Sequence, residues 1–234
     1  MADKEKTEVL LAVTHDFNNP LSTINIAMRN LIDGIGGELS DIHTVIVKSC
    51  LATVDKLHKL IEDILNFSKE GFNRINLKRE FFDLNLVIKD EIESVMQMAQ
   101  ERKLELRYNA PASEIRMWGD KNKLSRVVMN LVSNALKYTP KGGGIDVRLS
   151  ADENAVELTV INSGPGITPE EIGRLFKKYE RLDKHSNIEG TGLGLSIVKD
   201  IVDAHNGRIT VESELDKKTE FKVILPKDLR GKLR

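Results

Sequence analysis

The sequence contains one cysteine and no long hydrophobic run, and each absence excludes a class of protein. Cys50 cannot form an intramolecular disulfide or supply a cysteine-rich metal site, so we interpret it as a small buried hydrophobic residue. No apolar run approaches the roughly 18 residues needed to cross a bilayer. The charged N-terminus, MADKEKTE, is not a signal peptide. We therefore expect a cytoplasmic chain without membrane insertion.

The sequence also lacks an excess of charge of either sign. Lys and Arg total 35 and Asp and Glu total 36, which gives a net charge of -1, and the two signs are interspersed. A nucleic-acid binder needs a basic face toward the phosphate backbone, so no nucleic-acid partner is expected. With 234 residues, 40% of them hydrophobic, the chain is long enough for one large domain or two modest ones.

Two heptad seams in the N-terminal third predict a pair of helices. The first seam consists of Leu10, Thr14, Phe17, Leu21, Ile24, Met28 and Leu31. After a break at Gly34, Gly36 and Gly37, the second consists of Val47, Cys50, Val54, Leu57, Ile61 and Ile64. One hairpin is too narrow to bury both seams well, so we expect a homodimer that forms a four-helix bundle. A hairpin packed against the rest of its own chain is the alternative.

The rest of the chain predicts an α+β two-layer sandwich, in which one mixed sheet is covered by helices. Residues 72–79 lose the helical period and are interpreted as a linker. Asp120 is expected to cap one helix, and Thr168 to begin another with Pro169 in its first turn and Glu171 closing a capping box. Further helices are expected over about 84–102 and 193–205, and strands near 81, 104–108, 118, 145–149, 156–161, 209–212 and 221–225.

Three short motifs indicate a phosphate-binding site. In NLVSNALKY, Asn130 and Asn134 lie one helical turn apart with Lys137 alongside, which suits a hydrated divalent cation held against phosphates. NSGPGI (162–167) and GTGLGL (190–195) are loops whose backbones can approach a ligand. The second precedes a helix, whose first amides can bind phosphate oxygens. His15, within HDFNNPL, is a candidate phosphate acceptor near the start of an amphipathic helix.

In this order, the motifs resemble the H-, N-, G1-, F- and G2-type boxes of two-component sensor histidine kinases. The resemblance implies a HisKA-type dimerisation and histidine phosphotransfer domain over 1–71. It also implies a GHKL-type catalytic domain with the Bergerat ATP-binding fold over 80–228. The expected function is Mg-ATP-dependent autophosphorylation of His15, followed by transfer to an aspartate on a response-regulator receiver domain.

The resemblance assigns roles to the motif residues. Asn134 and Asn130 are expected to hold Mg²⁺, Lys137 to neutralise phosphate charge, and Tyr138 to stack on adenine. Arg181, with Phe176 and Tyr179 in an F-type box, is expected to reach the terminal phosphate from a mobile lid over 177–189. The residues expected at the nucleotide are Asn130, Asn134, Lys137, Tyr138, Asn162, Gly164, Gly166, Ile167, Arg181, Gly190, Thr191, Gly192, Leu193, Gly194 and Leu195.

Two asparagines depart from the patterns of related proteins. Asn162 stands where this family has an aspartate that binds the adenine amino group. The asparagine carbonyl can accept the same hydrogen bond but without its charge-assisted part, worth about 1 kcal/mol, so weaker ATP binding is predicted. Asn130 stands where related ATPases have a glutamate that activates water, which argues for phosphoryl transfer over hydrolysis.

The phosphoacceptor motif carries three expected catalytic residues. His15 is expected to offer a neutral nitrogen to the phosphoryl donor, and Asp16 to orient the imidazole and take its proton. Asn19, one turn later, matches the position that dephosphorylates the regulator in this family, so phosphatase activity is also expected.

Two other functions remain open: a catalytically degenerate dimeric signalling scaffold, and an ATP-hydrolysing conformational machine. Only fourteen residues precede His15. A truncated chain, or a kinase that depends on an upstream sensory module or partner, is therefore expected.

Overall fold

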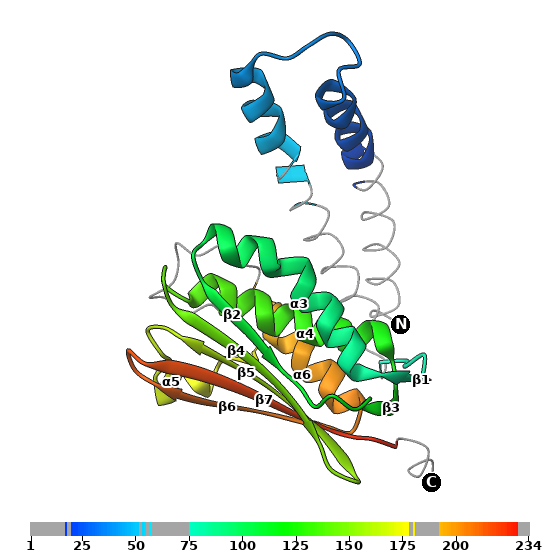
Figure 1. The fold of residues 1–234 in the computed structure, drawn as a ribbon, viewed down its shortest axis with the longest axis vertical. Coiled ribbons are helices and arrows are strands. Elements are labelled where there is room, and N and C mark those ends of the chain that lie inside the picture. Colours follow the sequence, from blue (N-terminus) through cyan, green and yellow to red (C-terminus); the bar gives the residue numbers. More distant parts are fainter. Residues whose placement is uncertain are drawn as a thin grey trace, which may run out of the picture. The chain divides into compact units, whose positions relative to one another are not determined.

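The structure, a computed structural model, describes residues 17, 20–51, 53–54, 57, 75–177, 180 and 192–228. The chain divides into two compact units, Met1–Arg74 and Ile75–Arg234. The first is helical where it is described, and the second combines helices with strands (Figure 1). No helix among the described residues is both long enough and apolar enough to span a membrane.

The helical unit contains the predicted hairpin. Helices cover residues 20–32 and 41–51, and the turn between them includes Gly34, Gly36 and Gly37, all at positive φ. Val47 and Val54 are buried and Cys50 is half-buried, which confirms this part of the second seam. Many large apolar side chains stay exposed in the single chain: Phe17, Ile24, Ile26, Leu31, Ile32, Ile35, Ile42, Val45, Ile46 and Leu57.

The α/β unit contains seven strands and four helices among its described residues. They are β1 (Glu80–Asp83), α3 (Leu84–Glu101), β2 (Glu105–Asn109), β3 (Arg116–Gly119), α4 (Lys121–Tyr138), β4 (Gly144–Ala151), β5 (Ala155–Ser163), α5 (Pro169–Ile172), α6 (Gly194–Ala204), β6 (Arg208–Glu214) and β7 (Lys218–Pro226). Five strands form a sheet in the order β2-β4-β5-β7-β6. Its β2–β4 pair is parallel and the others are antiparallel, so the mixed sheet is confirmed.

The prediction of one sheet was incomplete, because β1 and β3 pair separately as a two-stranded antiparallel sheet. Both strands end where a helix begins. Asp83, which ends β1, is the N-cap of α3, and its Oδ1 accepts hydrogen bonds from the backbone amides of Asn85 and Ile115, each at 3.0 Å. One carboxylate therefore caps the helix and ties the ends of β1 and β3 together.

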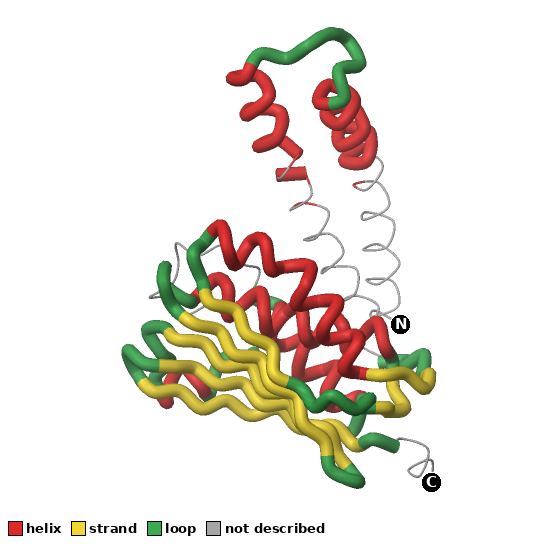
Figure 2. Tube along the Cα trace, in the orientation of Figure 1, coloured by secondary structure: helices red, strands yellow, loops and turns green. Residues whose placement is uncertain are grey.

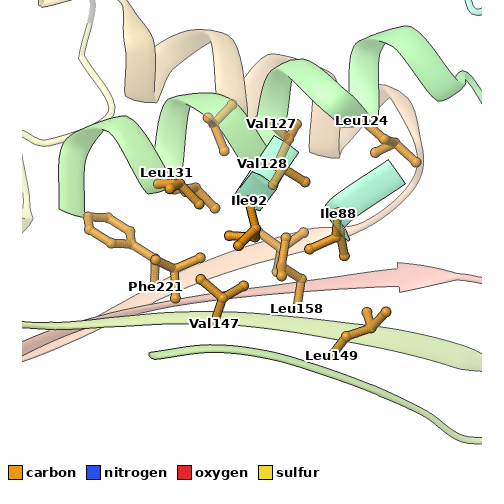
Figure 3. Packing of buried hydrophobic residues seen from close by; sticks show 14 of the residues in the cluster. Ile88, Ile92, Leu124, Val127, Val128, Leu131, Val147, Leu149, Leu158 and Phe221 are labelled. Atoms are coloured by element: carbon orange, nitrogen blue, oxygen red, sulfur yellow. The ribbon is translucent and has the colours of Figure 1, made fainter. Parts of the chain in front are cut away.

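Helices α3, α4 and α6 lie on one face of the five-stranded sheet (Figures 1 and 2). The core between the layers is apolar: Ile92 from α3 and Leu131 from α4 point toward Val147, Leu158 and Phe221 of the sheet (Figure 3). Burying a side chain of this size stabilises the fold by about 1.5–3 kcal/mol. The core thereby fixes the rotation of α4 about its axis.

The two helix caps predicted from sequence are present. Asp120 is the N-cap of α4, where its Oδ1 accepts a hydrogen bond from the amide of Lys123 at 3.0 Å. The capping box of Thr168 and Glu171 is complete, with Pro169 in the first turn of α5. Both depend on side chains within three residues of the helix start, which is why the sequence alone predicted them.

His205, at the end of α6, is a structural residue. Its side chain is fully buried. Its Nε2 accepts a hydrogen bond from the backbone amide of Asp120 at 3.0 Å, and its Nδ1 lies 2.8 Å from the carbonyl oxygen of Ile201. Nδ1 therefore carries the proton and donates it, since a carbonyl oxygen only accepts. The neutral ring joins the end of α6 to the start of α4, and burial lowers its pKa below the ordinary value.

Candidate functional site

The C-terminal half of α4 presents polar side chains beside the apolar stripe that faces the core. Leu131, Val132, Ala135 and Leu136 are buried in that stripe. Asn130, Asn134 and Tyr138 are half-buried and Lys137 is exposed. Because residues four apart share a helix face, Asn130 and Asn134 occupy one flank of α4. The predicted N-type motif is therefore placed at the edge of the core, where a ligand can reach it.

Asn130 carries a buried polar group without a partner. Among the described residues, its Nδ2 is buried and makes no hydrogen bond. Its Oδ1 lies 3.4 Å from the position that a Cβ on Gly194 would occupy, at the start of α6. A buried amide left unpaired costs about 1–3 kcal/mol, and a ligand with an acceptor group would remove that cost. Asn130 is thus arranged for a bound group.

The start of α6 suits an anion. Gly192 has a φ of +71°, in the left-handed region that favours glycine. Leu193 is the N-cap residue, and no side chain among the described residues makes a capping hydrogen bond there. Gly194 begins the helix and half-buried Leu195 follows. Helix N-terminal amides and the helix dipole favour phosphate oxygens.

The loop after β5 forms another part of the site, and its glycines are required by close packing. A Cβ on Gly164 would lie 2.9 Å from the carbonyl oxygen of Tyr138, at the end of α4. Gly166 has a φ of +70°, and a Cβ there would lie 2.6 Å from the carbonyl oxygen of Glu214. The structure therefore brings the loop, including Ile167, between α4 and the β6–β7 hairpin.

Asn162 lies at the end of β5 and is 5% exposed. Its Nδ2 donates a hydrogen bond to the carbonyl oxygen of Ser163 at 3.1 Å. This contact sets the orientation of the side-chain amide and leaves its Oδ1 as the acceptor for a ligand. A carboxylate at this position would lose that donor, so an aspartate here would require a different local hydrogen-bond pattern.

Sequence reasoning missed Thr219, which lies directly opposite Asn162 in the β5–β7 register. Thr219 is 5% exposed, and residues directly opposite in an antiparallel pair point to the same face. Its hydroxyl therefore lies on the same side of the sheet as the Asn162 amide. The only sequence signal is an alternating strand with a polar residue at an inward position.

The donor set constrains how a cation would bind. Among the described residues, no three His, Cys, Asp or Glu side chains are grouped as metal ligands. The amides of Asn130 and Asn134 are neutral oxygen donors, which suit Mg²⁺ when phosphates and water complete its coordination. The Nδ2 of Asn130, unpartnered among the described residues, is a donor and suits a phosphate oxygen, whereas only the Oδ1 of the same amide could face a cation.

Several predicted site residues lie outside the described residues. They are His15, Asp16, Asn19, Tyr179, Arg181, Gly190 and Thr191. Most of the expected lid, 177–189, also lies outside them. Phe176 is described and packs partly buried against the core. Asn130, Asn134, Lys137, Tyr138, Asn162, Gly164, Gly166, Ile167, Gly192, Leu193, Gly194 and Leu195 are all described, in α4, in the loop after β5 and at the start of α6.

Family models match both units. Residues 5–72 match the His Kinase A (phospho-acceptor) domain. Residues 119–229 match the family of histidine kinase-, DNA gyrase B- and HSP90-like ATPases. The second match contains α4, the loop after β5, and α6.

Curated relatives match nearly the whole chain. Histidine protein kinase DivJ of Caulobacter vibrioides is 31% identical over 94% of this chain and 37% of its own length. Adaptive-response sensory kinase SasA of Synechococcus is 31% identical over 94% of this chain and 59% of its own. The chain thus spans between about a third and three fifths of the length of these relatives.

Solved structures agree with the sequence matches. Full-length ShkA in complex with AMPPNP matches with a TM-score of 0.79 at 27% identity, over 94% of this chain and 45% of ShkA. The mycobacterial sensor histidine kinase MprB matches with a TM-score of 0.56 at 31% identity, over 64% of this chain and 98% of MprB.

Proposed function

We propose, because this chain belongs to the sensor histidine kinases of two-component systems, that it binds Mg-ATP in the α/β unit and phosphorylates His15. The phosphoryl group would then pass to an aspartate on a response-regulator receiver domain. Lys137, Tyr138, Asn162, Ile167 and the glycines of both loops would contact the nucleotide, and Arg181 its terminal phosphate.

The observation that carries this proposal is the buried Nδ2 of Asn130, which has no hydrogen-bond partner among the described residues and belongs to a side chain beside the start of α6. A site for an apolar ligand would not contain this amide. A buried amide with a purely structural role would be expected to form a hydrogen bond within the chain. Asn134, one turn later, supplies a second amide on the same flank. ShkA, which matches this chain over most of its length, has been solved with AMPPNP.

The proposed transfer is an in-line displacement on the γ-phosphorus. A neutral ring nitrogen of His15 forms the new N–P bond, the bond to the β,γ-bridging oxygen breaks, and ADP leaves with that electron pair. Asp16 holds the imidazole and accepts its displaced proton. Mg²⁺, when bound with ATP, neutralises charge on the phosphates. Asn130 and Asn134 would orient that bound group from α4.

The proposal also covers the binding partners of the protein and its cellular location. The exposed apolar side chains of the hairpin support a homodimer, since they would be buried against a second copy. A cytoplasmic location is proposed, together with control by an upstream sensory module or partner. Asn19 would support dephosphorylation of the regulator in addition to the kinase reaction.

A titration of the full chain with AMPPNP tests the nucleotide site. We expect binding in excess Mg²⁺ to weaken at least about tenfold when EDTA replaces the metal. Asn134→Ala should lose this metal dependence. Asn122→Ala, which changes an exposed asparagine in the first turn of the same helix, is the matched control and should behave as wild type.

The same preparation separates the two rival functions. A degenerate scaffold would bind no nucleotide under either condition. An ATP-hydrolysing machine would release phosphate steadily from Mg-ATP without forming a phosphoprotein. Magnesium-independent binding by the wild type would remove Asn134 from the metal site.

A further inference from the structure

Residues 75–79, the last part of the segment interpreted as a linker, belong to the α/β unit. We call these residues the strap. Ile75 is partly buried against the core of that unit. The backbone amide of Lys78 donates a hydrogen bond to Oδ2 of Asp120 at 2.8 Å. An apolar contact and a bond to a carboxylate therefore hold the strap in place.

Asp120, the N-cap of α4, is 4% exposed and bonds to three parts of the fold. Its Oδ1 accepts from the amide of Lys123 in the first turn of α4 at 3.0 Å, and its Oδ2 accepts from the strap. Its own amide donates to Nε2 of His205, at the end of α6, also at 3.0 Å. The strap, α4 and α6 therefore meet at one buried residue.

The same two helices meet again at the proposed nucleotide site. Asp120 precedes α4 and His205 follows α6, so the bond between them joins the start of α4 to the end of α6. Farther along α4, Oδ1 of Asn130 lies 3.4 Å from the position of a Cβ on Gly194, at the start of α6. Packed, rigid helices carry a displacement from one end to the other. The placement of Asn130 beside the start of α6 thus depends on the join at Asp120.

Docking of the strap is opposed by a buried group and supported by Asp120. The Nε of Arg79 is buried in the docked strap and makes no hydrogen bond among the described residues, which disfavours docking. Release of the strap would take the Lys78 donor away from a buried carboxylate, which must then find another partner or move toward water. Such a movement would disturb the α4 cap and the bond to His205, because Asp120 makes both.

We propose that Asp120 is a positioning residue for the nucleotide site and that the strap controls nucleotide affinity through it. This inference rests on the proposed function. With the strap docked, α4 and α6 are held in the arrangement that places Asn130 beside the start of α6, and the nucleotide binds tightly. With the strap released, Asp120 moves and the affinity falls. Because such coupling is reciprocal, bound nucleotide also holds the strap in place.

Binding of Mg-AMPPNP to the full chain, with matched changes at Lys78, tests this inference. Lys78→Pro removes the backbone N–H that donates to Asp120, and we expect the affinity to fall about fivefold or more. Lys78→Ala keeps this N–H, so it is the control and should bind as wild type does. Asp120→Asn keeps an acceptor for the α4 cap but has no second acceptor for the strap, so it should match Lys78→Pro. The double variant should bind no more weakly than either single variant, because both changes remove the same bond.

Hydrogen exchange of the wild type covers the case in which the variants do not fold. AMPPNP should slow the exchange of the Lys78 amide by about fivefold or more, since the nucleotide stabilises the docked strap. The control is the amide of Asn154, which donates to Oδ1 of Asp152 at 2.8 Å in the turn between β4 and β5. It should exchange at the same rate with and without nucleotide.

Several results would overturn the inference. If Lys78→Pro lowered the melting temperature but bound AMPPNP as wild type does, the strap would be merely structural. An equal loss of affinity in Lys78→Ala, additive losses in the double variant, or an exchange rate of the Lys78 amide that did not respond to nucleotide would also contradict it. Wild type that bound no AMPPNP would contradict the proposed function itself, and this inference with it.

Discussion

In the α/β unit the large apolar side chains pack against one another between the helices and the sheet, whereas in the helical unit most of those described are exposed. Ile88 and Leu131 of the α/β unit are fully buried. In the helical unit, Ile42 is 73% exposed and Val45 is 68% exposed. Monomeric proteins rarely leave many neighbouring apolar side chains in water.

The two units differ in which groups they leave exposed or unpaired within a single chain. The α/β unit closes its core within one chain and leaves the Asn130 amide nitrogen buried without a hydrogen-bond partner among the described residues. The hairpin leaves apolar side chains exposed, which the proposed homodimer would bury against a second copy. Association and nucleotide binding should therefore respond to different substitutions.

The largest expected effect is on association. Ile42 and Ile46 lie one turn apart in the second helix of the hairpin. Changing both to Glu would place four charges in the interface of a symmetric dimer and remove burial worth about 1.5–3 kcal/mol per side chain. We expect a monomer by analytical ultracentrifugation, with nucleotide affinity unchanged.

Leu86→Glu is the matched control, since Leu86 is 58% exposed on α3 of the other unit. This variant should associate as wild type does. A double Ile42→Glu, Ile46→Glu variant that remained dimeric would show that the exposed hairpin side chains are not the interface.

The next effect is confined to the nucleotide site. Asn130→Ala removes a buried amide that has no partner among the described residues, so the unliganded protein should be as stable as wild type or slightly more stable. Nucleotide affinity should nevertheless fall by roughly tenfold to a hundredfold. Thermal unfolding with and without AMPPNP measures both quantities. A parallel loss of stability and affinity would argue for a structural role.

A smaller effect concerns pH and His205. Burial lowers the pKa of His205 in the folded state, so the unfolded chain binds the proton more readily below its ordinary pKa of about 6.5. The stabilisation that comes from burying the neutral ring of His205 is fully present above about pH 6.5. It decreases as the pH falls from there toward the folded-state pKa, by no more than about 1.4 kcal/mol per pH unit.

Denaturant unfolding at several pH values measures this slope. His205→Gln should be less stable at neutral pH, because the join between α6 and α4 is altered, but it should show a flatter dependence below pH 6.5. An equal slope in the variant would exclude His205 as its source.

The smallest expected effect is a gain. Asn162→Asp should tighten nucleotide binding by several-fold, because a charge-assisted hydrogen bond is worth about 1 kcal/mol more than a neutral one. The unliganded variant should be less stable, since the bond from Asn162 to the Ser163 carbonyl is lost. Calorimetric titration measures the first quantity. Unchanged or weaker binding would mean that the amide already serves the base as well as a carboxylate does.

The sequence predicted those features that depend on neighbours along the chain. Asp120 and Thr168 cap their helices through amides only three residues away. The glycines of the loop after β5 were predicted from a contiguous motif. The alternation of apolar residues gave the strands of the five-stranded sheet, because a half-buried strand repeats every two residues.

Features that depend on distant pairing were not predictable in this way. The separate β1–β3 sheet requires Phe81 to pair with Trp118 across the whole of α3 and β2. Ser213 reaches Ile167 over 46 residues, and the Asp120 amide reaches His205 over 85. A serine and a histidine at such positions have no distinguishing local pattern, so only the folded chain reveals their partners.

The central claim is that ATP bound in the α/β unit phosphorylates His15 of the helical unit. The most direct measurement is incubation of wild type and His15→Gln with Mg-ATP labelled at the γ-phosphate, followed by acid and alkali treatment of the protein. The account predicts a label that is acid-labile and alkali-stable in wild type and absent from the variant. A label that persisted in His15→Gln, or no label in a wild-type protein that binds ATP, would contradict it.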